Sequence, residues 1–369
     1  MTLTKFRISG FKSLGPSFQE LLLQADATVL IGPNGAGKSN ILGAMTFLGQ
    51  VVRGNLQTVV EGASQLLYQG PKVSPFMDFE VWGLAQHASM DHLNGYKAVL
   101  AHLPAEDRLR FQSEEVFYWD KTQHPQKPYG YQLGTAHRES KLEAPPSEAE
   151  PIASYVRKNA LGWRVFHFHD TSPLSPPKQT CHIDSGATLR SDAGNLASFL
   201  FRLQENEPKH YGWIRDTIRQ VAPFFEDFNL VPSSKGQLRL LWRQRGMEST
   251  LGPDQISDGT LRFMCLATLL LQPSPPSVVL LDEPELGLHP FALNLLGELI
   301  RSASSRCQIL CSTQSSALVN HFDATQIRVV ENGRAGTYIK PVTAEELGPW
   351  LEDYSLGQIW EMNLIGGRP

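Results

Sequence analysis

The stretch GPNGAGKS, residues 32–39, decides the fold. It matches the pattern G-x-x-x-x-G-K-[S/T] in full, in which backbone N–H groups and a lysine surround a phosphate chain. The apolar run ATVLIG (27–32) precedes it, and apolar residues follow at helical spacing from Ile41 to Val51. A strand, a glycine loop and a helix in this order predict a nucleotide-binding P-loop. The alternative is a glycine-rich turn that only begins a helix.

The residue types of this loop suit a triphosphate. The glycines let backbone N–H groups turn toward the β-phosphate, and the helix N-terminus adds partial positive charge. Lys38 is expected to bridge the β- and γ-phosphates, and Ser39 to bind Mg²⁺. ATP and Mg²⁺ are therefore the expected cofactors. The expected nucleotide-binding residues are Gly32, Pro33, Asn34, Gly35, Ala36, Gly37, Lys38, Ser39 and Asn40.

A second motif, VVLLDEPE, ends an apolar run in Asp282 and Glu283. A carboxylate at the end of a strand beside the P-loop can hold Mg²⁺, and the next carboxylate can polarise the attacking water. We therefore expect Asp282 to be a metal ligand with Ser39, and Glu283 to be catalytic with Lys38. The alternative is two acids that merely cap a strand end.

Two further segments carry polar residues beside apolar runs. SDGT (257–260) precedes a helical pattern. Ser257 either caps that helix or helps its N-terminus to reach a γ-phosphate on another subunit. Gln314 follows the apolar run QILCS (308–312) and Thr313. Its amide can donate to a phosphate oxygen and accept from water, so a catalytic role is expected. The alternative is a hydrogen bond to a neighbouring loop.

The order of the segments predicts an α/β fold. Two apolar strands, SVVLL (277–281) and QILCS (308–312), flank a helical pattern, which indicates a parallel sheet buried on both faces. No long heptad region occurs, so no coiled-coil arm is expected. We expect a single domain over 1–369 with three parts: an N-terminal lobe at 1–135 with the P-loop and an antiparallel β subdomain, an inserted helical and β lid at 136–255, and a C-terminal lobe at 256–369.

In order, five segments resemble the ABC-type ATPases of the RecF/SMC/OLD group: FKSL (11–14), GPNGAGKSN (32–40), SDGT (257–260), LLDEPELGLHP (280–290) and STQSS (312–316). More narrowly, the chain is similar to the stand-alone RecF-like predicted ATPases, or AAA family ATPases. FHFHDTSP (166–173), LEDYSLGQIW and the terminal GGRP also resemble that family, so the match spans essentially the whole chain.

The resemblance implies an ABC-type P-loop domain that hydrolyses ATP as a head-to-tail dimer with the nucleotide sandwiched between subunits. Ser257, Asp258, Gly259 and Thr260 would form the signature motif acting in trans, and Asp282 and Glu283 the Walker B pair. Leu286 to Pro290 would be the D-loop, and Gln314 stands where a switch histidine is usual. The signature reads S-D-G and not S-G-G. The Q-loop glutamine stays open among Gln65, Gln69 and Gln86.

The resemblance also suggests a biological role. OLD-type relatives often carry a Toprim nuclease domain after the ATPase, whereas this chain ends at Pro369. We therefore expect a dimeric switch ATPase that controls a separate effector, a Toprim-type nuclease, in anti-phage defence. The alternative is a RecF-like DNA-repair or DNA-binding ATPase. A transporter ATPase and an ATP-binding scaffold without turnover are weaker alternatives.

Composition narrows the setting. No apolar run approaches the ~20 residues of a membrane helix, and the N-terminus lacks a signal-peptide pattern. Four scattered cysteines, Cys181, Cys265, Cys307 and Cys311, indicate reduced thiols in a cytoplasmic protein. The formal net charge is −4, so any contact with nucleic acid needs a local patch.

Three lesser features have competing interpretations. His167 and His169 share one face of an expected strand, which suits either a metal site or a polar strand edge, but a third ligand is not evident. Arginines 239, 243 and 245 share a strand face that either contacts nucleic acid or is simply solvated. The C-terminal Trp350, Leu351, Tyr354 and Trp360 are expected to pack in the core, with partner docking as the alternative.

Overall fold

The computed structural model describes residues 2–85, 91–160, 162–348 and 350–368. The P-loop joins a strand to a helix, as its pattern predicts. Strand β3 (Ala27–Ile31) is buried at all five positions, and helix α1 (Lys38–Val52) begins at the P-loop lysine. The loop therefore lies at the carboxyl end of a buried strand, where a helix N-terminus faces it.

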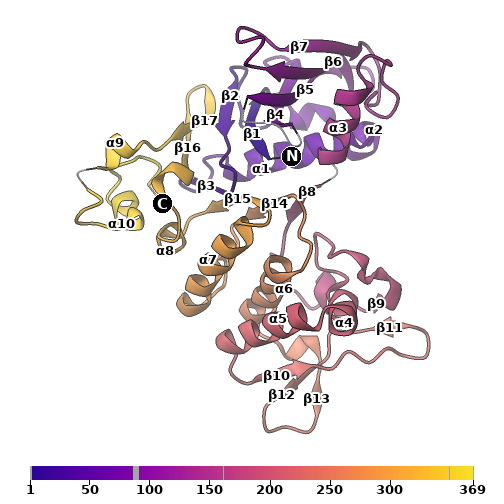
Figure 1. Cartoon of the computed structure of the whole chain (residues 1–369), viewed down its shortest axis with the longest axis vertical. Coiled ribbons are helices and arrows are strands. Elements are labelled where there is room, and N and C mark those ends of the chain that lie inside the picture. Colours follow the sequence, from indigo (N-terminus) through magenta and orange to yellow (C-terminus); the bar gives the residue numbers. More distant parts are fainter. Residues whose placement is uncertain (1, 86–90, 161, 349, 369) are drawn as a thin grey trace.

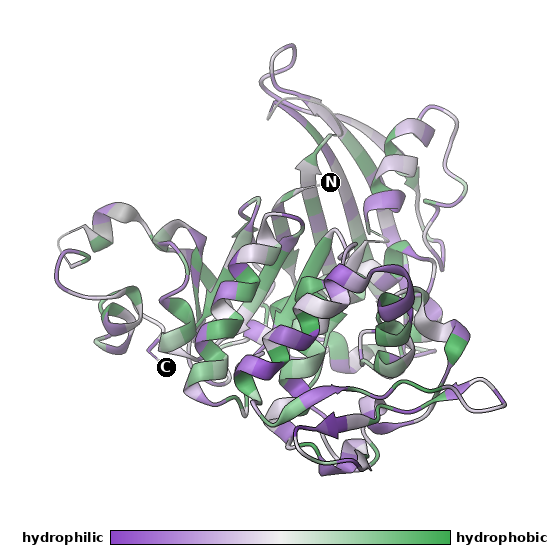
Figure 2. Cartoon of the chain, turned by 60° about the horizontal axis from the view of Figure 1, so that its bottom comes forward, coloured by the Kyte–Doolittle hydropathy of each residue, from purple (hydrophilic) through white to green (hydrophobic). Residues whose placement is uncertain are grey.

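A six-stranded sheet carries this loop. Its order is β17-β16-β3-β15-β14-β8, and the five strands from β16 to β8 are parallel while β17 is antiparallel. The other strands are β8 (Trp163–Phe166), β14 (Val278–Asp282), β15 (Gln308–Thr313), β16 (Ile327–Gly333) and β17 (Gly336–Pro341). Their apolar residues make this the green centre of the molecule in Figure 2. The predicted parallel sheet, buried on both faces, is confirmed.

An antiparallel sheet forms the second layer, with the order β2-β1-β4-β5-β6-β7. Its strands are β1 (Leu3–Ser9), β2 (Gln19–Leu22), β4 (Phe76–Leu84), β5 (His92–Leu103), β6 (Arg108–Asp120) and β7 (Tyr129–Gly134). Helix α1 packs between the two sheets, since one core cluster joins Phe79, Leu48 and Leu280. This sheet lies at the top of Figure 1 and packs against α1, the helix that follows the P-loop.

Helices cover the other face of the parallel sheet. They are α4 (Leu196–Asn206), α5 (Pro208–Val221), α6 (Asp258–Leu271) and α7 (Pro290–Ser304), and they share a second core cluster with β3, β14 and β15. Short strands flank α4 and α5 at the bottom of Figure 1. These are β9 (Cys181–His182), β10 (Phe225–Phe228), β11 (Gln237–Leu238), β12 (Trp242–Gln244) and β13 (Thr250–Leu251).

Helix α3 (Glu150–Ala160) and strand β8 lie within the region 136–255 that was expected to form an inserted lid. Helix α3 contacts β5 and β6 of the antiparallel sheet, and β8 is the edge strand of the parallel sheet. These two elements therefore pack with the two sheets, and the boundary expected at residue 136 stays a prediction. The remaining α-helices are α2 (Leu56–Val59), α8 (Ser316–Val319), α9 (Ala344–Leu347) and α10 (Leu356–Glu361).

Long helices are absent from the described residues. The longest, α1 and α7, have 15 residues each, so this part of the chain contains no coiled-coil arm, as expected. In the same ranges, no helix has both the length and the apolarity to cross a bilayer. The four cysteines are buried and form no disulfide with one another in this structure.

Two expectations about surface residues are wrong. The arginines at 239, 243 and 245 do not share a strand, because β11 ends at Leu238 and β12 spans only Trp242–Gln244; Arg239 instead pairs with Asp254 at 2.7 Å. Among the C-terminal apolar residues, Trp360 is fully buried and donates to the Gly367 carbonyl. Trp350, Leu351 and Tyr354 are exposed and do not pack in the core.

Candidate nucleotide site

The P-loop backbone requires glycine. Gly32, Gly35 and Gly37 have φ angles of 150°, 77° and 107°, which residues with a Cβ adopt rarely. A Cβ on Gly37 would lie 2.1 Å from Thr337 Oγ1, and one on Gly32 would lie 2.1 Å from the Val330 carbonyl oxygen. The loop is therefore both turned and closely packed, while Asn34 and Gly35 at its tip are exposed.

Strand β17 and the FKSL segment (11–14) contact the P-loop. The sequence did not indicate these contacts. The Thr337 hydroxyl donates to the Ala36 carbonyl oxygen at 2.8 Å and lies 2.8 Å from Ser13 Oγ. Asn40 Nδ2 donates to the same Ser13 hydroxyl at 2.7 Å. Ala36 and Asn40 of the P-loop are therefore fixed by hydrogen bonds to distant segments of the chain.

Lys38 is held inside the loop. Its ammonium donates to the carbonyl oxygens of Gly32 at 2.6 Å and Pro33 at 3.1 Å. These bonds use two of the three ammonium donors in the described structure, which leaves one for a phosphate oxygen. Burial lowers the pKa of Lys38, while the charges of Glu283, Glu285 and Asp282 raise it. The acids thus favour the charged form beside the candidate phosphate site.

Ser39 and Asp282, the two expected metal ligands, are in hydrogen-bond contact. Ser39 Oγ donates to Asp282 Oδ1 at 3.1 Å, although these residues lie at the ends of different elements. Mg²⁺ prefers oxygen ligands in an octahedron with bonds of about 2.1 Å, so neighbouring ligands stand about 3 Å apart. The donor types and their separation therefore fit Mg²⁺.

Glu283 adopts an uncommon backbone conformation, with a φ of 43°. Such positions cost energy and are found mainly where the surrounding structure fixes them, often at functional sites. The Glu283 N–H donates to the Ser312 carbonyl at 3.0 Å, which holds the strained residue against β15. The Gln314 side-chain amide donates to Glu283 Oε1. The glutamine therefore contacts the candidate base directly.

This contact gives a test of Gln314. We expect Gln314→Ala to lower ATP turnover by about 10- to 100-fold with little change in ATP affinity, because the Glu283 carboxylate loses its positioning donor. Gln314→His should retain activity, since an imidazole N–H can replace the amide. A glutamine side chain does not titrate near neutrality. The pH profile of ATP turnover between about pH 6 and 7.5 should therefore have the same shape in wild type and in Gln314→Ala. Unchanged turnover of the alanine variant would make this glutamine structural.

Glu285 is a half-buried acid beside Thr313 and Gln314. Its Oε1 accepts from Thr313 Oγ1 and from the Gln314 N–H, both at 2.7 Å. Its Oε2 is buried without a hydrogen-bond partner in the described residues. Burial raises the pKa of Glu285, which the two hydrogen bonds oppose and the Glu283 charge reinforces.

The raised pKa predicts a pH-dependent stability. Protonated Glu285 stabilises the fold fully below its unfolded pKa near 4.5, and this contribution is lost as the pH rises through the higher folded pKa. The free energy of unfolding of Glu285→Gln, relative to wild type, should therefore increase above pH 4.5, by at most about 1.4 kcal/mol per pH unit. Denaturant unfolding at several pH values measures it. Glu205→Gln, an exposed change on α4, should show no such trend; parallel curves for Glu285→Gln and wild type would contradict the prediction.

The candidate signature lies at the N-terminus of α6. Ser257 caps this helix, because its Oγ accepts from the Thr260 N–H at 3.3 Å, so the capping alternative is observed. Ser257 and Asp258 are nevertheless exposed, and the N-terminus remains open to a partner. A Cβ on Gly259 would lie 2.4 Å from the Gly287 carbonyl, so the signature packs tightly against the D-loop position of the same chain.

Arg262 joins these loops, and no sequence signal indicated it. Its guanidinium donates to the carbonyl oxygens of Phe168 at 2.9 Å and His169 at 3.0 Å, and also to that of Leu286. One side chain on α6 thereby connects the loop after β8 with the loop after Glu283. The D-loop position then ends at α7, whose N-cap is His289.

A histidine directly follows the strand that neighbours β14. Strands β8 and β14 pair in parallel with Phe166 opposite Leu281, so His167 follows next to Asp282. Burial lowers the pKa of His167, and the Asp282 charge opposes this. Gln65 and Gln69 make no described contact with Asp282, Glu283 or Gln314, and Gln86 lies outside the described residues.

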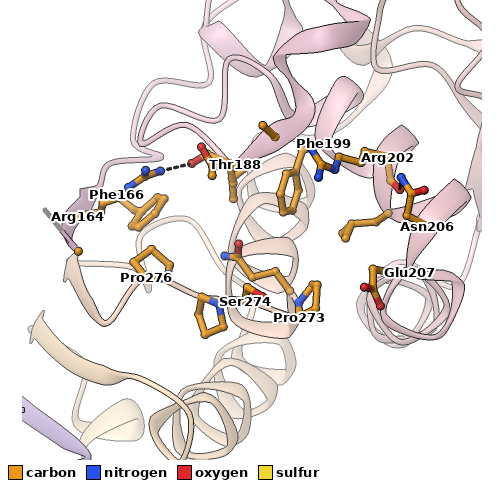
Figure 3. A pocket seen from close by; sticks show the side chains of 16 residues that line it. Arg164, Phe166, Thr188, Phe199, Arg202, Asn206, Glu207, Pro273, Ser274 and Pro276 are labelled. Atoms are coloured by element: carbon orange, nitrogen blue, oxygen red, sulfur yellow. Dashed lines mark hydrogen bonds between the residues drawn. The ribbon is translucent and has the colours of Figure 1, made fainter. Parts of the chain in front are cut away.

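A separate pocket lies beside β8, the edge strand of the parallel sheet (Figure 3). It has a volume of about 330 Å³ and opens between the start of β8, helix α4 and the prolines before β14. Phe166 and Phe199 line it together with Arg164 and Arg202. Its lining contains none of the P-loop, Asp282 or Glu283 side chains, so it is not the nucleotide site.

Comparisons with known proteins identify a family for this chain. A family model described as "AAA domain, putative AbiEii toxin, Type IV TA system" matches residues 27–320. No curated protein matches the chain.

Solved structures share the fold at low identity. An Smc head bound to the C-terminal winged-helix domain of ScpA has a TM-score of 0.62 and 16% identity, covering 95% of this chain and 100% of that one. A Pyrococcus furiosus Smc head with an extended coiled coil, bound to the C-terminal domain of ScpA, has a TM-score of 0.57 and 16% identity, covering 95% and 98%. A Pyrococcus yayanosii Smc head with a coiled coil and joint has a TM-score of 0.54 and 12% identity, covering 95% and 99%. The α/β architecture is therefore that of the ABC-type ATPase heads.

Proposed function

Since this chain belongs to the AAA-domain family described for a putative AbiEii toxin of type IV toxin–antitoxin systems, we propose that it hydrolyses ATP and uses nucleotide-gated dimerisation as a switch. The observation that carries the proposal is the meeting of two motifs at one sheet edge. Ser39 from the P-loop donates to Asp282 at 3.1 Å, and the next residue, Glu283, is a strained acid held by Gln314.

Each residue of the site has a separate role in the proposed hydrolysis of ATP. Lys38 and the P-loop N–H groups bind the phosphates, and Ser39 and Asp282 hold Mg²⁺, which when bound would neutralise charge on the β- and γ-phosphates. Glu283 accepts a proton from the attacking water, and Gln314 keeps its carboxylate in position. Ser257 completes the site of the facing subunit.

Exposed apolar residues support the dimer. Leu286, in the candidate D-loop, and Phe291, in the first turn of α7, are 43% and 53% exposed. A facing subunit would bury them. ATP bound by both surfaces favours the closed dimer over the open one, and this differential affinity lets hydrolysis drive a conformational change.

The switch would act on a separate effector. The family description names a putative toxin of a toxin–antitoxin system, which favours defence over DNA repair as the setting. We propose a nuclease of the Toprim type as the effector, in anti-phage defence. The free, buried thiols fit a cytoplasmic location. Purification of the native complex, with identification of co-purifying protein, tests the effector; recovery of DNA without a protein partner would contradict it.

The enzymatic claim has a simpler test. The purified chain should release phosphate from ATP, and Lys38→Ala should weaken ATP binding by about tenfold or more, because a charge-assisted bond to phosphate is lost. Lys72→Ala, an exposed lysine in a turn, is the matched control and should bind as wild type does. Equal ATP affinity of Lys38→Ala and wild type would contradict the proposal.

A further inference from the structure

The strand pairing brings together three metal-ligating side chains. His167 follows β8 and Asp282 ends β14, and the two strands are hydrogen-bonded neighbours with Phe166 opposite Leu281. His169 lies two residues further, with its ring centroid 6.1 Å from that of His167. The third ligand that the sequence alone lacked is therefore Asp282, which comes from a distant segment of the chain.

The ligand atoms are close enough to converge. One nitrogen from each histidine and one carboxylate oxygen of Asp282 all lie within 4.8 Å of one another. A tetrahedral ion with bonds of about 2.0–2.1 Å needs separations of about 3.4 Å, so small side-chain movements suffice to close the set.

Two atoms of the cluster make no described hydrogen bond. Ser39 and Ser312 both donate to Oδ1 of Asp282, and no described donor contacts Oδ2. His169 Nδ1 is buried without a hydrogen-bond partner in the described residues. This nitrogen is therefore not engaged by another described side chain.

The loop that carries the histidines is fixed in place. Arg262 donates to the backbone carbonyl oxygens of Phe168 and His169, at 2.9 and 3.0 Å. These bonds anchor the loop to α6 and leave the imidazoles free to bind an ion. Such support of ligand-bearing segments is typical of metal sites.

We propose that His167, His169 and Asp282 form a binding site for a divalent transition-metal ion such as Zn²⁺. Two imidazoles and one carboxylate suit Zn²⁺, with water as the fourth ligand, whereas Mg²⁺ prefers oxygen ligands. The inference extends the proposed function, because Asp282 also belongs to the ATP site. An ion here competes for, or bridges to, the carboxylate that faces Ser39, and it therefore changes ATP turnover supported by Mg²⁺.

The test measures metal binding without nucleotide. The full chain is freed of metal with a chelator and titrated with Zn²⁺, and the bound metal is counted after desalting. We expect about one ion per chain in wild type, and at least a tenfold loss of affinity in His167→Ala, in His169→Ala and in the more conservative His167→Gln. His124→Gln, in the loop between β6 and β7, removes a histidine outside the cluster and should leave affinity unchanged.

The outcomes separate this inference from the proposed function. Lys38→Ala should lose ATP binding yet keep the metal. A chain that binds Zn²⁺ through the two histidines but does not hydrolyse ATP with any metal contradicts the proposed function alone. Wild type without bound Zn²⁺, or folded His167→Gln and His169→Ala variants that bind as wild type does, would overturn the inference. Circular dichroism of each variant verifies that it is folded.

Discussion

Glu283→Gln is expected to lower ATP turnover by about 10²- to 10⁴-fold while ATP binding is retained. Glutamine has nearly the shape of glutamate, so it can keep the position fixed by the Ser312 carbonyl. It cannot accept a proton from water. Lys38, Ser39 and Asp282, which bind phosphate and Mg²⁺ in this account, remain unchanged.

The same variant should accumulate the ATP-bound dimer, because the closed state forms but hydrolysis no longer opens it. Steady-state phosphate release, equilibrium ATP binding and light scattering with and without ATP measure the three effects. Glu298→Gln, an exposed change on α7, is the matched control and should behave as wild type. Turnover near wild type in Glu283→Gln would remove this residue from the role of base.

Ser257→Arg is expected to abolish turnover although each monomer still binds ATP. Ser257 is exposed at the N-terminus of α6 and makes no described contact with the P-loop of its own chain. A long cation there blocks close approach of the helix N-terminus to the facing γ-phosphate. The change does not disturb the phosphate contacts of Lys38 and Ser39.

Ser147→Arg is the matched control, because it introduces the same side chain at an exposed position away from α6, in the segment before α3. That control should keep wild-type turnover and dimerise with ATP. Loss of ATP binding by monomeric Ser257→Arg would mean that the serine serves its own subunit's site or only its helix.

Local patterns sufficed for the centre of the fold. β3, the P-loop and α1 follow one another, and their apolar spacing and glycines specify each of them without distant contacts. The same holds for Asp282 and Glu283, because a fully apolar strand that stops at two acids marks its carboxyl end. These residues could therefore be placed at one sheet edge in advance.

Features that depend on distant pairing could not be predicted. His167 lies beside Asp282 only because β8 is the parallel neighbour of β14. Arg262 has the sequence character of any surface arginine, yet it binds three backbone carbonyl oxygens of other loops.

The sequence also does not show which of the C-terminal apolar residues are buried. The sequence does not distinguish Trp360, which is buried, from Trp350, which is exposed. The arginines near residue 240 were placed on one strand because alternation was extended through a segment whose strands are only two and three residues long.

The central claim is that two subunits build each ATP site. Its most direct test is phosphate release from a mixture of Lys38→Ala and Ser257→Arg chains, each inactive alone. A twofold-symmetric dimer that exchanges subunits should contain one intact site in every mixed pair, with activity of up to about a quarter of wild type in an equal mixture. No activity, under conditions in which mixed dimers are demonstrably formed, would contradict the account.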